Sequence, residues 1–178
     1  MARKTSSPSP LNTGELHGTP LGNLWIAVGQ RGLVAIEWSA SELEFSQYLT
    51  KRFKRPVEPN PKMTAQAAGQ LGEYLQGKRR QFSIPIDWSV LRPFQKQVLK
   101  VTFGIPYGQT RTYGEIAATL GNPRAARAVG RAEATNPMPL VIPCHRVIGA
   151  DNKLHGYGGG DGLPTKEWLL KMEGAVFA

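Results

Sequence analysis

Residues 112–133 of this 178-residue chain read TYGEIAATLGNPRAARAVGRAE, and this stretch decides the fold of the second half. Thr112 is suited to cap a short helix that ends at Leu120, whose apolar residues recur at the spacing of one helix face. A Gly-Asn-Pro tripeptide then breaks the chain, and a second helix follows over residues 124–133. A short helix, a tight turn and a second helix are typical of a helix-turn-helix.

The second of these helices mixes alanine and glycine with arginine. A helix with ordinary side chains is about 10–12 Å across, whereas the minor groove of DNA is only about 6 Å wide. Small side chains would let this helix approach DNA closely. Small residues also allow two protein helices to pack closely, and from the helix alone both interpretations stand equally. Its arginines are Arg124, Arg127 and Arg131.

Downstream of this helix lies the only cysteine of the chain. The apolar run 140–142 should be buried, and Pro143 ends it so that Cys144 is presented at a turn beside His145. A lone cysteine is either a small buried hydrophobe or a reactive thiolate, depending on the groups around its sulfur. The neighbouring histidine favours reactivity modestly, and a Cys–His hydrolase is a fair first interpretation.

A glycine-rich loop over residues 156–162 comes next, and an amphipathic helix follows over residues 164–172. The loop lacks the glycine spacing of nucleotide-binding motifs, so it is not predicted to cradle a phosphate. We expect it to form a mobile wall or lid.

The first half of the chain reads as a small α/β unit. Residues 24–28 and 33–38 are β-prone runs separated by a short glycine-containing loop, which predicts a hairpin. Ser39 and Glu42 fit a capping box for a helix over residues 40–53.

A further helix is expected over residues 62–76, followed by an edge strand over residues 81–86 that contains a proline. From Pro93 the pattern is helical again, and it stops at Gly104. The first half contains no nucleotide loop, no cluster of carboxylates and no Cys/His spacing for a metal, so we predict no site in it.

Composition is that of a globular protein, with 40% apolar and 20% charged residues, and no apolar run approaches the ~18 residues of a membrane span. We expect a soluble protein, and the net charge of +9 favours a polyanionic partner. Residues 1–12 are polar and rich in proline and serine, which predicts a disordered tail. The rest divides into an amino-terminal α/β domain with a short antiparallel sheet (13–88) and a mostly helical domain (89–178), which together make an α+β fold.

Several motifs of the second half occur in an order that is typical of one family, and they span about residues 92–174. The chain resembles the O6-alkylguanine-DNA alkyltransferases, which take an alkyl group from the O6 of guanine onto their own cysteine. The first half resembles the family's amino-terminal domain only in its length and its order of strands and helices. The motifs are IPYG (105–108), TYGEIA (112–117), GNP (121–123), AARAVG (125–130), NP (136–137), IPCHRVI (142–148), GYGG (156–159) and KEWLL (166–170).

The resemblance implies a single-use reaction at Cys144. A free cysteine has a pKa of ~8.5 and is mostly protonated at neutral pH, so a base has to take its proton. In the family this base is a histidine that acts through a water and is oriented by a glutamate, and those positions match His145 and Glu167. Without the resemblance, His145 would be an ordinary turn histidine and Glu167 a surface charge. The implied catalytic residues are Cys144, His145, Glu167, Tyr113 and Asn136.

The resemblance also implies that the damaged nucleotide is flipped out, since a base inside the duplex cannot be reached. Arg127 matches the arginine that fills the vacated space, and Tyr113 matches the tyrosine that crowds the phosphate and contacts the base. Asn136 matches the asparagine that ties the helix-turn-helix to the cysteine turn. The backbone carbonyls of Cys144 and Val147 would read the flipped guanine. The implied DNA contacts are Arg127, Tyr113, Thr112, Ala125, Ala126, Arg124 and Gly130, and the implied base pocket consists of Val147, Tyr157, Gly158, Arg146 and Pro139.

Two features depart from the family pattern. The segment between Tyr157 and Lys166 is about two residues longer than the family's usual spacing, which would make the lid wider or place it differently. The first half lacks the cysteine and histidine residues with which some members bind zinc, and we expect no metal and no cofactor.

The expected partner is double-stranded DNA that contains O6-alkylguanine, with O4-alkylthymine as a second candidate lesion. We expect a monomer without membrane association, located in the cytoplasm at the nucleoid of a prokaryote or in the nucleus of a eukaryote. The alternative function is a non-catalytic protein that binds alkylguanine DNA and recruits repair factors, but such proteins lack the cysteine. A helix-turn-helix transcription regulator is a third interpretation, and its repair-sensing members need an amino-terminal zinc module that this sequence lacks.

Overall fold

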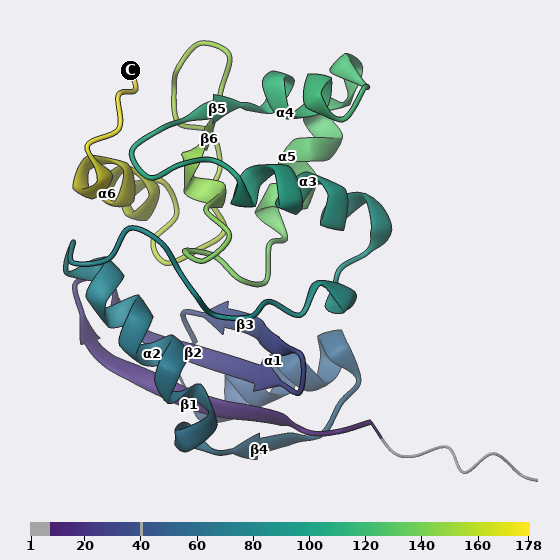
Figure 1. Cartoon of the computed structure of the whole chain (residues 1–178), viewed down its shortest axis with the longest axis vertical. Coiled ribbons are helices and arrows are strands. Elements are labelled where there is room, and N and C mark those ends of the chain that lie inside the picture. The colour runs from purple at the N-terminus through teal and green to yellow at the C-terminus, as the bar shows by residue number, and fades with distance from the viewer. Residues whose placement is uncertain (1–7, 40) are drawn as a thin grey trace, which may run out of the picture.

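The first half of the chain contains a mixed four-stranded sheet, and the helices of the second half lie above this sheet in Figure 1. The computed structural model describes residues 8–39 and 41–178. The strands lie in the order β3-β2-β1-β4; β1 pairs antiparallel with β2 and β2 with β3, whereas β4 runs parallel to β1. They are β1 (Leu11–Thr19), β2 (Gly22–Gly29), β3 (Gly32–Glu37) and β4 (Val57–Pro59).

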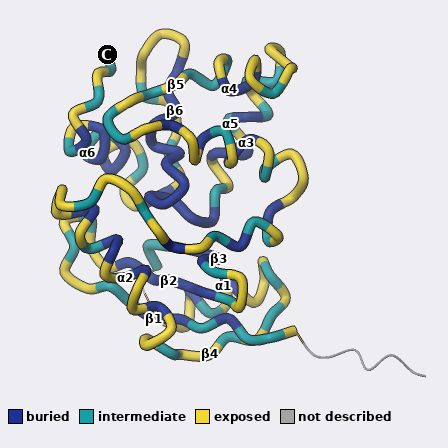
Figure 2. Tube along the Cα trace, in the orientation of Figure 1, coloured by how far each residue is buried: buried dark blue, intermediate teal, exposed yellow. Residues whose placement is uncertain are grey.

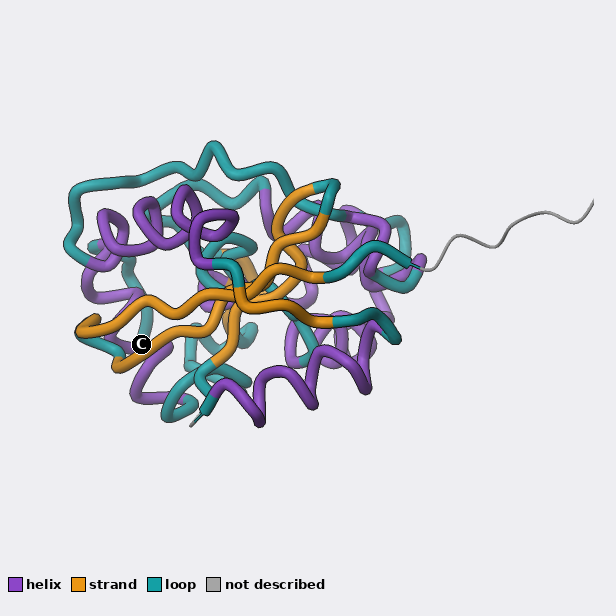
Figure 3. The backbone as a smooth tube through the Cα atoms, turned by 90° about the horizontal axis from the view of Figure 1, so that it is seen from below, coloured by secondary structure: helices purple, strands orange, loops and turns teal. Residues whose placement is uncertain are grey.

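Helices cover both faces of this sheet, as Figure 3 shows from below. Alternate residues of a strand point to opposite faces, so β2 serves two cores. Trp25 packs in a cluster with Phe45 of α1, and Ile26 packs in a second cluster with Leu71 of α2. The expected hairpin and both expected helices are confirmed. The helices are α1 (Glu42–Phe53) and α2 (Pro61–Leu75).

Three expectations for the first half are wrong in detail. Residues 11 and 12, assigned to the tail, belong to β1, whose backbone groups pair with both β2 and β4. The sheet is mixed rather than antiparallel, because the short strand β4 joins the free edge of β1 in parallel. Helix α1 is capped by Ser41, whose hydroxyl accepts from the Glu44 amide, and not by Ser39. Expectations for residues 1–7 and Ala40 lie outside the described residues.

The edge strand expected over residues 81–86 is reduced to one bridge. Leu33 pairs with Ile86, and the Leu33 amide donates to the Pro85 carbonyl at 2.8 Å. Because a proline has no backbone N–H, the segment lacks the donors for a longer ladder.

Three helices of the second half pack around their own apolar core. The expected cap is confirmed, since the Thr112 hydroxyl accepts from the Glu115 amide and the Glu115 side chain accepts from the Thr112 amide. The second helix of the expected pair begins with a short 3₁₀ turn. None of the helices in the described part of the chain is long and apolar enough to cross a membrane. The elements are η1 (Trp88–Val90), α3 (Pro93–Phe103), β5 (Arg111–Thr112), α4 (Tyr113–Thr119), η2 (Pro123–Ala125), α5 (Ala126–Ala134), η3 (Cys144–Arg146), β6 (Val147–Ile148) and α6 (Leu163–Glu173).

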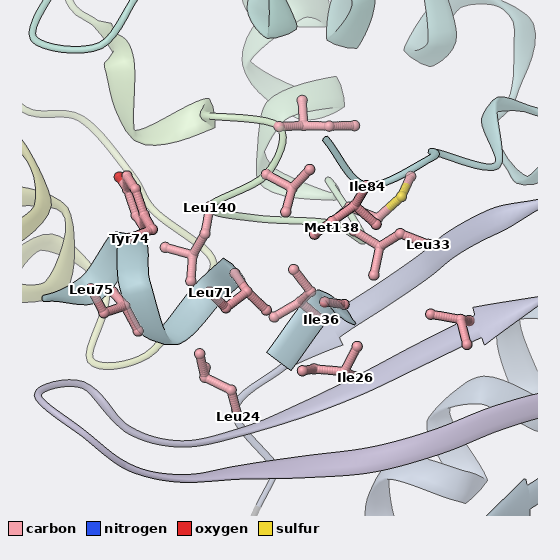
Figure 4. Close-up of a cluster of buried hydrophobic side chains, with 14 of the residues drawn as sticks. Leu24, Ile26, Leu33, Ile36, Leu71, Tyr74, Leu75, Ile84, Met138 and Leu140 are labelled. Carbon is pink, nitrogen blue, oxygen red and sulfur yellow. The ribbon is translucent and has the colours of Figure 1, made fainter. Parts of the chain in front are cut away.

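The segment that leads to the cysteine is held between the two halves. Residues 137–149 are all buried, and Figure 2 shows dark blue chain below β6. Met138 and Leu140 belong to the same buried cluster as Ile36 of β3 and Leu71 of α2, which Figure 4 shows in close-up. The Ile36 amide also donates to the carbonyl of Pro137 at 2.8 Å. The segment before Cys144 is therefore packed against β3 of the sheet and against α2.

Candidate functional site

Cys144 opens the 3₁₀ turn η3 and is 6% exposed. The segment before it is pinned by Asn136, whose side-chain amide donates to the Ile142 carbonyl at 2.9 Å and accepts from the Met138 amide at 2.9 Å. Burial, together with the nearby charge of Glu133, raises the pKa of the Cys144 thiol to about 12. A thiol in this state needs a base before it can act as a nucleophile.

His145 lies next to the cysteine and is fully buried. Its Nε2 is 3.0 Å from Oε1 of Glu173, and because a carboxylate only accepts, Nε2 carries the hydrogen. Its Nδ1 has no hydrogen-bond partner among the described residues. Burial lowers the pKa of His145 below its usual value despite the neighbouring carboxylate, so the ring is neutral at pH 7. A neutral imidazole with an open Nδ1 lone pair is a proton acceptor.

Glu173 is held by two further side chains. The Arg146 guanidinium donates to both of its oxygens, at 2.9 and 2.8 Å. Burial alone would raise the pKa of Glu173, but the hydrogen bonds from His145 and Arg146 lower it well below its usual range. The Tyr74 hydroxyl donates to Oε1 at 2.5 Å and lies 3.2 Å from the His145 Nε2. Tyr74 belongs to α2, so the first half, for which no site was expected, contributes to the support of His145.

Glu167 is not the carboxylate beside the histidine, and the sequence-based assignment is wrong. Its side chain is 46% exposed and accepts from Lys171 one turn later at 2.6 Å. Residues six apart on a helix lie about 120° apart around its axis, so Glu173 lies on a different face of α6 from Glu167, and that face is buried. The expected end of this helix, at residue 172, fell one residue short of Glu173.

A cavity of about 720 Å³ opens beside Cys144. Helices α4 and α5 form one wall and the glycine-rich segment forms the other. This volume lies in the range of ordinary small-molecule sites. Of the expected DNA and base contacts, Tyr113, Ala126, Arg127, Gly130, Tyr157 and Gly158 line it, together with Gly114, Glu133, Ala134, Ala150, His155 and Gly156.

Lys166 joins the cysteine turn to the glycine-rich segment. Its Nζ donates to the Val147 carbonyl at 2.6 Å, to the His155 carbonyl at 3.0 Å and to the Gly156 carbonyl at 3.4 Å. The Tyr113 hydroxyl donates to the same His155 carbonyl at 2.9 Å. Burial lowers the pKa of Lys166 to about 8. In the sequence this lysine is only the first residue of the KEWLL motif, and no local signal indicates where its side chain lies.

The glycine-rich segment packs closely at two positions. A Cβ at Gly158 would lie 2.9 Å from the Ala134 carbonyl, and one at Gly159 would lie 2.6 Å from the Trp38 ring. A side chain at Gly158 would push the segment away from α5, and one at Gly159 would meet Trp38, the residue that follows β3. The segment is thus a wall of the cavity, and its motion as a lid stays a prediction.

Arg146 does not belong to the base pocket, which is a second correction. Its guanidinium is occupied by Glu173 and by the Ile105 carbonyl, 2.6 Å away. It lines a separate cavity of about 540 Å³. Pro139 borders a small cavity of about 90 Å³ behind Cys144. Among the remaining expected DNA contacts, Thr112 caps α4, and Arg124 and Ala125 lie on η2 outside the larger cavity.

Glu133 is the second buried glutamate near the cysteine, and it was not expected. It is 6% exposed, and its Oε1 accepts from the Thr102 hydroxyl at 2.5 Å. Its Oε2 has no hydrogen-bond partner among the described residues. Burial raises the pKa of Glu133 to about 7. In the sequence it is one polar residue of an arginine-bearing helix, and no local signal marks it.

Two family profiles together match nearly the whole chain. The profile described as "6-O-methylguanine DNA methyltransferase, ribonuclease-like domain" matches residues 15–88. The profile described as "6-O-methylguanine DNA methyltransferase, DNA binding domain" matches residues 93–175.

Relatives and solved structures agree with these profiles. The methylated-DNA–protein-cysteine methyltransferase of Methanosarcina barkeri is 42% identical over 157 residues, which cover 87% of this chain and 92% of that protein. The protein of the same name from Mycolicibacterium paratuberculosis is 52% identical over 116 residues, or 64% of this chain and 67% of that protein. Among solved structures, Mycobacterium tuberculosis OGT in complex with DNA has a TM-score of 0.75 at 38% identity, covering 92% of each chain.

Proposed function

Because the chain belongs to the 6-O-methylguanine DNA methyltransferase family and repairs DNA by alkyl transfer to its own cysteine, we propose that Cys144 is the acceptor. Cys144 is the only cysteine of the sequence. It lines the cavity between α5 and the glycine-rich wall. The two profile matches also support a domain boundary between residues 88 and 93.

The reaction follows from the groups around the sulfur. The Cys144 thiol gives its proton to the open Nδ1 of His145, directly or through a water, and the Glu173 carboxylate stabilises the imidazolium that forms. The thiolate attacks the alkyl carbon, the bond from this carbon to O6 breaks, and the electron pair leaves with the guanine. The guanine then takes up the proton. Hydrolysis of the new thioether would have to expel the Cys144 thiolate, which is a poor leaving group from an alkyl carbon, so each molecule reacts once.

One observation carries this proposal: the residue that follows the only cysteine is a buried histidine whose Nδ1 has no hydrogen-bond partner among the described residues and whose Nε2 is held by a buried carboxylate. Burial of Cys144 disfavours the thiolate until the base acts, which would protect the sulfur from other electrophiles.

We propose that α5 enters the minor groove and that the damaged nucleotide is flipped into the larger cavity. The exposed arginines of η2 and α5 would meet the phosphates, and Arg127 at the mouth of the cavity would fill the gap in the duplex. Tyr113 and Tyr157 would contact the base, and the Val147 carbonyl, held by Lys166, would help to read it. Binding should weaken with salt, because phosphate contacts release counterions.

The relatives named above are archaeal and bacterial proteins. On this basis we propose a cytoplasmic location beside the chromosome.

The test is the intact mass of the protein after exposure to duplex DNA that contains O6-methylguanine. We expect the mass of one methyl group to be added, once per molecule, and peptide mapping to locate it on Cys144. A protein that binds the DNA without gaining mass would instead be a non-catalytic alkylguanine binder.

Arg127→Ala should slow repair of O6-methylguanine in a duplex by at least about tenfold, because the flipped state loses the side chain that replaces the base. Reaction with free O6-benzylguanine, which needs no flipping, should change far less. Rates are measured by mass under single-turnover conditions for both substrates. Arg124→Ala removes an equal charge outside the cavity and should only weaken binding modestly. Equal losses on both substrates in Arg127→Ala would refute the flipping role.

A further inference from the structure

A cavity of about 540 Å³ lies apart from the one beside Cys144, and the two share no lining residue. Three stretches of chain form it: the residues that follow α2, the residues that follow α3, and the segment that leads into η3. Its volume is within the range of small-molecule sites, about 300–1,000 Å³. The proposed alkyl transfer makes no use of this cavity.

Three aromatic rings line the cavity, those of Phe82, Phe103 and Tyr107. Tyr107 is held from two sides. Its hydroxyl donates to the Met172 carbonyl at 3.3 Å, and its ring meets the Tyr74 ring edge-on, with the ring centroids 6.3 Å apart. Aromatic rings pack favourably against other flat rings. The walls therefore suit a ligand that has a flat apolar body.

Arg146 brings unused hydrogen-bond donors to the same cavity. Its side chain is only 7% exposed, and a guanidinium has five N–H donors. The bonds to Glu173 and to the Ile105 carbonyl use one N–H on each of the three nitrogens. The other two, one on Nη1 and one on Nη2, have no acceptor among the described residues. Buried donors without an acceptor are uncommon, and an oxyanion in the cavity would accept from them.

Arg80 adds a positive charge that no carboxylate balances. Its exposed guanidinium makes no hydrogen bond or ion pair with the described residues, whereas the neighbouring Arg79 is paired with Glu73 at 2.6 Å. The guanidinium carbons of Arg80 and Arg146 lie 5.4 and 5.7 Å from the centroid of the Tyr107 ring. No aspartate or glutamate of the described chain lines the cavity. The charge around it therefore favours an anion.

We propose that this cavity binds a small anion that joins an oxyanion to a flat ring. The oxyanion accepts from the free N–H groups of Arg146 and faces Arg80, and the ring packs among the aromatic side chains of the wall. A neutral ligand of the same shape would lack the charge that both guanidinium groups attract. Aromatic carboxylates and nucleoside monophosphates share this chemistry, and the experiment tells these two sources apart.

The test is calorimetric titration of the protein with benzoate and with benzamide, which has nearly the same shape but no charge. Benzoate should bind at least about tenfold tighter, because its bonds to the arginines are charge-assisted. Adenosine monophosphate is titrated in parallel against adenosine. The anion that binds more tightly, benzoate or adenosine monophosphate, identifies the source.

Two variants locate the binding. Arg80→Gln should weaken binding of the tighter anion at least about fivefold, since one of the two charges at the cavity is lost. Lys78→Gln removes an equal charge from an exposed residue outside the cavity and should keep the wild-type affinity. In nitrogen-15 spectra, the Nε–H signal of Arg146 should shift with the anion and stay in place with its neutral analogue.

Three results would overturn the proposal. Equal affinity for each anion and its neutral analogue would mean that the arginines do not select charge. Equal losses in Arg80→Gln and Lys78→Gln would mean that only the net charge of the protein matters. A shift of the Gly158 amide signal without a shift at Arg146 would place the anion in the cavity beside Cys144. Methyl transfer is followed separately by mass, and Arg80→Gln should keep its rate within about twofold, because Arg80 lies outside the cavity that takes the flipped base.

Discussion

Glu173→Gln slows alkyl transfer to Cys144 by at least about a hundredfold, in the range typical for loss of general-base catalysis. The amide has nearly the same shape, but it has no charge with which to stabilise the His145 imidazolium. It also leaves the buried guanidinium of Arg146 without an anion. Loss of one partner of a buried ion pair costs about 3–5 kcal/mol of stability, so the melting temperature should fall as well.

The matched control for this variant is Glu167→Gln, which sits six residues earlier on the same helix. Its side chain is exposed and pairs only with Lys171, so its transfer rate should stay within about twofold of the wild type. Both rates are measured by mass at a temperature where both variants are folded, as judged by circular dichroism. A large loss in Glu167→Gln with a small loss in Glu173→Gln would contradict the assignment of the carboxylate.

Cys144→Ala abolishes alkyl transfer altogether, because the sequence contains no other thiol. Binding to duplex DNA with O6-methylguanine should remain, since the arginines of α5 and the walls of the cavity are unchanged. The lesion would then stay in the cavity instead of being repaired. The variant should therefore prefer alkylated over unmodified duplex in a fluorescence anisotropy titration at fixed salt.

Intact mass decides the first part of this prediction. A methyl adduct on Cys144→Ala would mean that another nucleophile accepts the alkyl group. Loss of all DNA binding would mean that the thiol itself organises the cavity. Arg127→Ala in the Cys144→Ala background is a useful companion, because it should remove the preference for the alkylated duplex.

Periodic and local features of the chain were predicted well. The hairpin of β2 and β3, the helices α1 to α3 and the capped helix α4 follow from apolar spacing, glycines and caps within a few residues. The same reasoning placed Cys144 on a turn after a buried run, and η3 confirms this. These elements depend on interactions between residues that are close in the sequence.

The missed carboxylate shows where such reasoning stops. A helix turns about 100° per residue, so choosing between Glu167 and Glu173 requires the phase of α6 relative to the cysteine turn. The sequence alone does not give that phase. Tyr74 and Glu133 were missed for a related reason: Tyr74 meets His145 across 71 positions of sequence, and Glu133 meets Thr102 across 31. Only tertiary packing brings these pairs together.

The contact of the Tyr74 phenol with His145 and Glu173 has a consequence for how the protein can be divided. A chain cut at the boundary near residue 88 would keep every residue that we propose to contact DNA, yet it would lose Tyr74 of α2, which now covers the histidine and its carboxylate. Two separate family profiles match residues 15–88 and 93–175, but the segment that contains Cys144 depends on a residue of the other one. The Tyr74 phenol of the other segment supports the proposed base and its carboxylate, so we expect both segments to be needed for full activity.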